Sequence, residues 1–270
     1  MSGFGRCSLA VITPIISAMG IQCVPVPTAV LSTHTGGFDD FVFRDMTDFI
    51  SPCCKHYRQL GIQFDTIYSG FLGSDAQVDS CIEFFDTFPS ARRIVDPVMG
   101  DDGECYKTYT PRLVERMKEL VRSADIITPN MTEAAILLDE DYTDTVDRIT
   151  ARGMLIRLCE MAKAAVITGV KLDTGEHANI FMRRGSDEMS EICWEPLPAS
   201  YPGTGDIFSS VMTGRLTLGA ELTEAVETAT VFVRNAVSVT MDNGQPRRNG
   251  VEFERLLGEL SETDDKHHEG

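Results

Sequence analysis

One short segment in the last third of the chain combines residue types that suit phosphoryl transfer. The run YPGTGDIF begins at Tyr201 and places Gly203, Thr204, Gly205 and Asp206 at the start of an apolar helical pattern. Glycines let the backbone approach a ligand, and the free amides of a first helical turn bind anions. An acid there would repel a phosphate unless it accepts a proton from the attacking group. The segment predicts Asp206 as general base beside an anion hole; the alternative is that Asp206 only caps the helix.

Two further segments place polar side chains just past predicted strands, where open α/β sheets bind their ligands. Asp96 ends the run RIVD, and Asn130 and Glu133 follow the run IITP with a spacing of three residues. A nucleotide-dependent transferase holds Mg²⁺ through one or two carboxylates together with waters and phosphates. Asp96 and Glu133 are therefore the metal candidates. For Asn130 and Glu133 the alternative is a helix N-cap with its capping-box acid.

Two loops with glycines are candidates for the substrate side. The segment STHTGGF places His34 and Thr35 before a flexible Gly pair that could close over a small ring. The segment YSGFLG places Phe71 where it could stack on a planar substrate, although an aromatic residue at a strand end more often belongs to the core. His34 is equally compatible with a loop histidine whose ring nitrogens are satisfied within the protein.

The composition favours small-molecule chemistry. The chain has 270 residues, of which 43% are hydrophobic, and a formal net charge of -17, so neither nucleic acid nor an anionic membrane is an expected partner. Its start is a poor signal peptide, and its apolar runs are shorter than the roughly 18 residues of a membrane span. The eight cysteines lack CxxC spacing and suit a reducing compartment. We expect a cytoplasmic protein.

Short β-branched runs alternate with amphipathic stretches, which is typical of an α/β fold with a mostly parallel central sheet and helices on both faces. The predicted strands are 22–26, 29–32, 64–69, 93–97, 125–128, 164–169, 177–183 and 189–195. The predicted helices are 45–60, 75–88, 110–123, 143–161, 205–218 and 223–241. We expect one domain over residues 1–258 and a loose, polar, acidic tail over 259–270.

Seven segments occur in an order that resembles one known family. SGFGRCS, LSTHTGGF, YSGFLGS, VDPVMGD, ITPNMTEA, ITGV and GTGDIF are similar to motifs of pyridoxal/pyridoxamine kinases, within the ribokinase-like superfamily, from Ser2 to about Thr240. The resemblance implies a ribokinase-like fold and ATP-dependent phosphorylation of the 5′-hydroxymethyl group of pyridoxal, pyridoxine or pyridoxamine. It further implies Mg²⁺ with ATP, a monovalent cation that is usually K⁺, and a homodimer.

The resemblance also implies roles for single residues. Asp206 matches the catalytic base, and Gly203, Thr204 and Gly205 match the anion hole. The positions that hold the pyridine ring are matched by Ser2, Thr35 and Phe71, with Val98 as an apolar neighbour. The nucleotide and metal side is matched by Asp96, Tyr106, Asn130, Glu133 and Thr168.

The start of the chain departs from the family pattern. Relatives carry a hydrophobic strand before SGFG, and here Met1 takes the place of its last residue. We therefore expect the first strand to be missing from this chain, the neighbouring strand edges to be exposed, and Ser2 to lie on a mobile terminus. A start upstream of Met1 is favoured over a shortened chain. For the same reason the GFG run is weak support for a Rossmann dehydrogenase, because no strand precedes it.

Two other functions stay open. A hydroxymethylpyrimidine kinase of thiamine synthesis shares the fold and a planar substrate, but that branch typically carries a cysteine where this chain has Asp206. A non-catalytic B6-binding protein is the alternative that the short start suggests.

Overall fold

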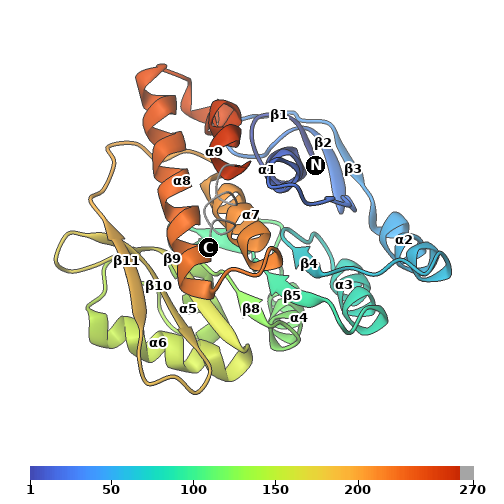
Figure 1. The fold of residues 1–270 in the computed structure, drawn as a ribbon, viewed down its shortest axis with the longest axis horizontal. Helices are drawn as coiled ribbons and strands as arrows, with labels where there is room; N and C mark the ends of the chain where they lie inside the picture. Colours follow the sequence, from blue (N-terminus) through green and yellow to red (C-terminus); the bar gives the residue numbers. More distant parts are fainter. Residues whose placement is uncertain (262–270) are drawn as a thin grey trace, which may run out of the picture. The chain divides into compact units, whose positions relative to one another are not determined.

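The computed structural model describes residues 1–261, which divide into two compact units (Figure 1). Unit 1 combines Met1–Met46 with the chain from Leu197 onward, and unit 2 is Thr47–Pro196. Within residues 1–261, no helix combines the length and the apolar character needed to cross a bilayer.

Unit 1 is built on a small sheet of three strands, in the order β1-β2-β3. β1 runs parallel to β2, with Ser2 opposite Leu31, and β3 is antiparallel to β2. The strands are β1 (Ser2–Phe4), β2 (Ala29–Thr33) and β3 (Phe43–Asp45). The helices are α1 (Leu9–Ala18), α7 (Thr204–Thr217), α8 (Leu222–Asp242) and α9 (Leu257–Ser261), with short 3₁₀ turns η1 (Arg247–Asn249) and η2 (Glu254–Leu256).

Helix α7 is the centre of unit 1. It packs against α1 and against α8, which runs beside it in Figure 1, and every residue from Ile207 to Leu216 is buried. The approach of α1 depends on a small residue, because a Cβ added at Gly214 would meet Met19 Sδ at 2.4 Å. Close packing about two turns after Asp206 thus fixes α1 against α7 and brings the N-terminal ends of the two helices together.

Unit 2 holds a six-stranded sheet in the order β11-β10-β9-β8-β5-β4, which can be followed in Figure 1. Strands β4, β5, β8 and β9 are parallel to one another. β10 is antiparallel to β9, and β11 is antiparallel to β10. The strands are β4 (Thr66–Ser69), β5 (Arg92–Val95), β8 (Ile126–Ile127), β9 (Ala164–Lys171), β10 (His177–Arg183) and β11 (Ser190–Trp194). A buried run such as Ala164 to Ile167 is typical of a parallel strand covered on both faces.

Five helices and one hairpin complete unit 2. α3 contacts β4, α5 contacts β9, and α6 contacts β9 and β10. The helices are α2 (Thr47–Gln59), α3 (Asp75–Thr87), α4 (Pro111–Arg122), α5 (Met131–Leu138) and α6 (Arg148–Met161), and the hairpin pairs β6 (Gly100–Asp101) with β7 (Glu104–Cys105). One hydrophobic core, from Leu72 to Met182, lies within this unit.

Most predicted elements are confirmed, within a few residues at their ends. The strand predicted at 22–26 is wrong, because that stretch is irregular; Pro25 and Pro27 lack the N–H that a strand donates. The helix predicted from 143 begins at Arg148, because Asp147 caps it by accepting the amides of Ile149 and Thr150. Helix α1, strands β1 and β3, and the β6-β7 hairpin were not among the predicted elements.

The predictions for the two ends of the chain have different outcomes. Ser2 is 5% exposed and lies in β1, where it pairs with Leu31 of β2, so the expected mobile placement is not what the structure shows. Residues 259–261 of the predicted loose tail belong to α9, where Leu260 is buried, and residues 262–270 lie outside the described residues. The prediction of one kinase domain over residues 1–258 stays a prediction.

Candidate active site

The first turn of α7 presents three backbone amides that are not used in the fold. Gly203 is the N-cap, and no side chain caps the helix. The amides of Thr204, Gly205 and Asp206 donate no hydrogen bond within residues 1–261. A helix start with free amides carries a partial positive charge. This turn is therefore suited to hold an anion, as the sequence predicts.

The two glycines of this turn have different reasons to be glycine. Gly203 has a φ of 88°, and a Cβ there would lie 2.1 Å from the backbone oxygen of Arg6. A Cβ on Gly205 would meet nothing within 4 Å. Gly203 is thus required by the fold itself. Nothing in the packing requires Gly205, which is consistent with space left for a ligand.

The Asp206 carboxyl lies between the starts of two helices. Its Oδ2 accepts a hydrogen bond of 2.8 Å from the amide of Ser8, the N-cap of α1. Burial raises the pKa of Asp206, and the Ser8 amide opposes that shift by stabilising the charged form. No hydrogen bond to Oδ1 is found among residues 1–261. A carboxylate with a raised pKa and one unoccupied oxygen can accept a proton from a bound hydroxyl.

The predicted ring-binding residues of unit 1 lie in β1 and in the loop after β2. Ser2 is buried, and Thr35 is exposed. His34 is 6% exposed: its Nδ1 accepts the amide of Gly36 at 3.1 Å, and its Nε2 lies 2.7 Å from the Arg248 carbonyl oxygen. This pattern assigns the proton of a neutral ring to Nε2. His34 therefore has both ring nitrogens satisfied within the protein, and its contact with substrate stays a prediction.

The acids of unit 2 lie at the carboxyl end of the parallel strands. Glu133 is 3% exposed and accepts two backbone amides, from Asn130 at 2.8 Å and from Met99 at 3.1 Å. Asn130 accepts the Glu133 amide in return, so the capping box is present. Burial raises the pKa of Glu133 well above its usual value, and the charge of Asp96 raises it further. The capping role and the placement beside a second acid are therefore both found.

The other predicted residues of unit 2 differ in their burial and in their partners. Asp96 is 7% exposed and accepts a hydrogen bond of 3.1 Å from the Tyr68 hydroxyl. Thr168 is half-buried within β9 and forms a bridge with Asn130, which follows the end of β8. Three residues lie on less regular segments: Val98 is half-buried, Tyr106 is 41% exposed, and Phe71 packs edge-on against Tyr109.

The paired acids fit a hard divalent cation. Two buried carboxylates that repel each other are stabilised by a positive charge, and carboxylate oxygens are the ligands that Mg²⁺ prefers. Among residues 1–261, no cluster of three or more His, Cys, Asp or Glu side chains suited to a metal is found. Asp96 and Glu133 therefore suit a Mg²⁺ that also binds waters and phosphates, rather than an ion enclosed by protein ligands.

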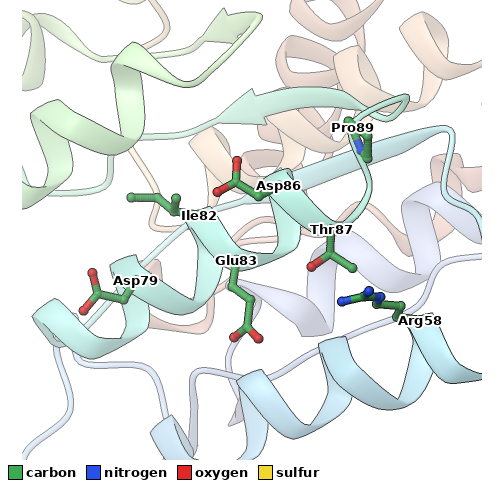
Figure 2. A pocket seen from close by; sticks show the side chains of 7 residues that line it. All are labelled: Arg58, Asp79, Ile82, Glu83, Asp86, Thr87 and Pro89. Atoms are coloured by element: carbon green, nitrogen blue, oxygen red, sulfur yellow. The ribbon is translucent and has the colours of Figure 1, made fainter.

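An open groove of about 720 Å³ lies elsewhere on unit 2, between α2 and α3 (Figure 2). Arg58 comes from the end of α2, and Asp79, Glu83 and Asp86 come from α3. None of the predicted site residues lines this groove. An acidic, open surface of this kind does not suit an anionic ligand such as ATP.

Sequence reasoning missed two residues that bear on Asp206. The partner of its carboxylate is the backbone amide of Ser8, and Arg6 packs its carbonyl against Gly203. Both lie in the GFGRCS run, which contains the Gly5 and Ser8 of an incomplete dinucleotide fingerprint. The only signal was that this run and GTGD belong to the same set of ordered motifs, because a backbone donor leaves no trace in residue type.

Comparisons with known proteins bear on the fold and the family. A crystal structure with pyridoxal, of a Bacteroides thetaiotaomicron protein assigned as a candidate phosphomethylpyrimidine kinase, has a TM-score of 0.90 and 37% identity and covers 96% of this chain and 92% of that one. Pyridoxal kinase from Lactobacillus plantarum has a TM-score of 0.91 and 29% identity, over 99% and 96% of the two chains. The predicted ribokinase-like fold and the resemblance to pyridoxal kinases are thus confirmed.

One relative is a plant enzyme of thiamine biosynthesis. The chloroplastic thiamine biosynthetic bifunctional enzyme of Arabidopsis thaliana is 29% identical over 231 residues, which are 84% of this chain. This chain spans 43% of that enzyme's length. The model of one family, described as phosphomethylpyrimidine kinase, matches residues 14–250. This match covers most of the sequence and shows that the chain belongs to the phosphomethylpyrimidine kinase family.

Proposed function

We propose that the protein is an ATP-dependent kinase that phosphorylates the 5′-hydroxymethyl group of a B6 vitamer. The observation that carries the proposal is the first turn of α7, where the Asp206 carboxyl has a raised pKa and three neighbouring amides have no acceptor among residues 1–261. This turn offers a base for a hydroxyl proton and a cradle for phosphate charge within four residues. The similarity to a structure that contains pyridoxal supports the substrate class.

The chemistry follows from the turn. Asp206 takes the proton of the hydroxymethyl group as that oxygen forms a bond to the γ-phosphorus of ATP, and the bond from the γ-phosphorus to the bridging oxygen of ADP breaks. The Ser8 amide keeps Oδ2 in place, so the proton goes to Oδ1. The amides of Thr204, Gly205 and Asp206 receive negative charge on the transferred group.

The acids of unit 2 carry the proposed nucleotide side. Asp96 and Glu133 would hold Mg²⁺, which neutralises phosphate charge when it is bound. Asn130, Tyr106 and Thr168 are the proposed nucleotide contacts. The dependence on K⁺, the homodimer and the cytoplasmic location stay predictions.

Hydroxymethylpyrimidine is the second candidate substrate. The family description and the plant thiamine enzyme favour it. Asp206 argues for the B6 vitamers, because the hydroxymethylpyrimidine kinases typically carry a cysteine at the position of this acid. A non-catalytic B6-binding protein would retain binding but release no ADP.

A coupled ADP-release assay with pyridoxal, pyridoxamine, pyridoxine and hydroxymethylpyrimidine separates these candidates. We expect turnover with at least one B6 vitamer and a kcat/KM for hydroxymethylpyrimidine at least tenfold lower. Asp206→Asn should lower kcat about 10³-fold, within the range of a lost general base, and largely spare ATP binding. Preference for hydroxymethylpyrimidine would move the assignment to the thiamine branch, and binding without ADP release would rule out a kinase.

A further inference from the structure

The Gly5–Ser8 turn, defined as residues 5–8, lies directly against the start of α7. The Arg6 carbonyl oxygen fills the space that a Cβ on Gly203 would need, at 2.1 Å. The Cys7 thiol lies 3.5 Å from the same point, and the Ser8 amide bonds Asp206. Three consecutive residues of the turn thus contact the segment that carries the proposed base and anion hole.

Ser8 adopts a backbone conformation that its side chain disfavours. Its φ of 55° and ψ of -140° lie outside the common regions for a residue with a Cβ. Such a conformation is strained and persists only where the surroundings hold it. In this conformation the Ser8 amide points at the Asp206 carboxylate. Some other group must therefore hold the turn.

Arg6 is the residue that holds the turn from its other side. Its amide donates to the Asn249 carbonyl oxygen at 3.3 Å, and its guanidinium pairs with Glu254 at 2.6 Å and with Glu252 at 3.8 Å. A Cβ on Gly250 would lie 2.9 to 3.1 Å from Arg6 atoms, so the backbones also pack closely. Arg6 is thus fixed between the 249–254 segment and Gly203.

We propose that Arg6 is a positioning residue for Asp206: its anchorage to Glu254 and Glu252 holds the Ser8 amide on the Asp206 carboxylate. The inference rests on the proposed function, in which Asp206 is the base. A hydrogen bond from an amide to a carboxylate stabilises the charged form, so its loss makes the carboxyl hold its proton to higher pH. Arg6 thereby sets the pH above which the base works and keeps Oδ1 directed to the hydroxyl.

Few other ionisable groups in the described part of the chain face Asp206. They are the N-terminal ammonium, His34 and the Cys7 thiol, whose pKa is raised to about 12 by burial and by the charge of Asp206. A thiol with that pKa stays neutral in the working range. All three groups are the same in the Arg6 variants, so a shift of the Asp206 titration there does not come from a new charge that faces the carboxyl.

The test compares Arg6→Met, Arg6→Lys and Glu254→Gln with the parent protein. Asp206 is titrated in the ligand-free protein by ¹³C NMR of the aspartate carboxyls, with its resonance assigned by its loss in Asp206→Asn. We expect Arg6→Met to move this titration up by about one pH unit and to move the acidic limb of kcat equally, so that kcat on that limb falls about tenfold. Glu254→Gln should move the titration and the acidic limb of kcat in the same direction, but by less. Arg6→Lys should show a smaller shift than Arg6→Met, because the lysine keeps the positive charge. The KM for ATP should stay within about threefold of the parent value in all three variants.

Arg148→Met is the matched control, because Arg148 also pairs with two carboxylates, Glu191 at 2.9 Å and Glu176 at 3.3 Å, but lies in unit 2. It should leave the titration unchanged. If Arg6→Met does not fold, the Asp206 titration and the acidic limb of kcat in Glu254→Gln decide between the outcomes. An unmoved titration, or a kcat that falls equally at every pH, overturns the proposal. A shifted titration in a protein that phosphorylates none of the four substrates supports the positioning role and rejects the proposed kinase.

Discussion

The amide of Ser8 donates a hydrogen bond of 2.8 Å to Oδ2 of Asp206, across 198 positions of sequence. The bond joins the N-cap of α1 to the first turn of α7, and Gly214 lets these helices pack closely. Two partial positive charges from helix starts therefore stabilise one buried carboxylate. Burial still raises the pKa of Asp206, which makes it a stronger base than an exposed aspartate.

The first prediction concerns the stability of Asp206→Asn. A carboxyl whose folded pKa is raised above the unfolded value stabilises the fold at pH values below the unfolded pKa, and this contribution is lost as pH rises through the folded pKa. At pH 7, which lies above the unfolded pKa, the Asp206 carboxyl is therefore less favourable for folding than a neutral side chain would be. Asn is close to isosteric and can still accept the Ser8 amide. We expect thermal unfolding to show a higher Tm for Asp206→Asn than for the parent at pH 7.

The pH dependence supplies the check on this first prediction. The Tm advantage should shrink as pH falls below the folded pKa of Asp206, because the parent carboxyl is then neutral. An Asn substitution at the exposed Asp102 should show no such pattern. A lower Tm for Asp206→Asn at pH 7 would mean that the carboxylate stabilises the fold, contrary to its raised pKa.

A second prediction separates the two glycines of the anion hole. Gly203→Ala places a Cβ at a φ of 88° and 2.1 Å from the Arg6 carbonyl oxygen, which should lower the free energy of unfolding by about 2–4 kcal/mol. Gly205→Ala meets nothing and adds a better helix former, so stability should rise by about 0.5–1 kcal/mol. Denaturant unfolding measures both.

The matched pair also tests the role of Gly205 in the proposed reaction. If its missing Cβ leaves room for a phosphate, the stabilised Gly205→Ala should lose at least tenfold in kcat/KM for ATP. Full activity in Gly205→Ala would show that this position does not approach the ligand.

Residue types and their periodicity predict most helices and strands and the side chains at their ends, but they do not predict contacts made by backbone atoms. The strand ends that carry Asp96 and Asn130, and the helix start that carries Asp206, follow from apolar runs bounded by polar residues. The hydrogen bond from Ser8 to Asp206 does not follow, because its donor is a backbone amide. The strand at Ser2 does not follow either, because it has only three residues and Ser2 pairs with a residue 29 positions away. The strand predicted at 22–26 failed because local β-branching was weighed above two prolines.

A third prediction concerns His34 as a support of the loop after β2. His34→Ala removes the contacts to the Gly36 amide and to the Arg248 carbonyl oxygen, as well as the edge-on packing against Phe38 at 5.0 Å. The unfolding free energy should fall by about 2–3 kcal/mol. The KM for the vitamer should rise several-fold, because Thr35 loses its anchored neighbour. Exposed His56→Ala serves as control and should change neither quantity.

A fourth prediction contrasts the two acids of unit 2. Glu133→Ala leaves the amides of Met99 and Asn130 without their acceptor, and each buried donor costs about 1–3 kcal/mol, so stability should fall by about 2–4 kcal/mol once the relief of repulsion is included. Asp96→Asn can still accept the Tyr68 hydroxyl and removes the charge that raises the pKa of Glu133. That variant should be at least as stable as the parent without Mg²⁺, yet need at least tenfold more Mg²⁺ for half-maximal ADP release. Unchanged Mg²⁺ dependence in Asp96→Asn would exclude Asp96 as a metal ligand.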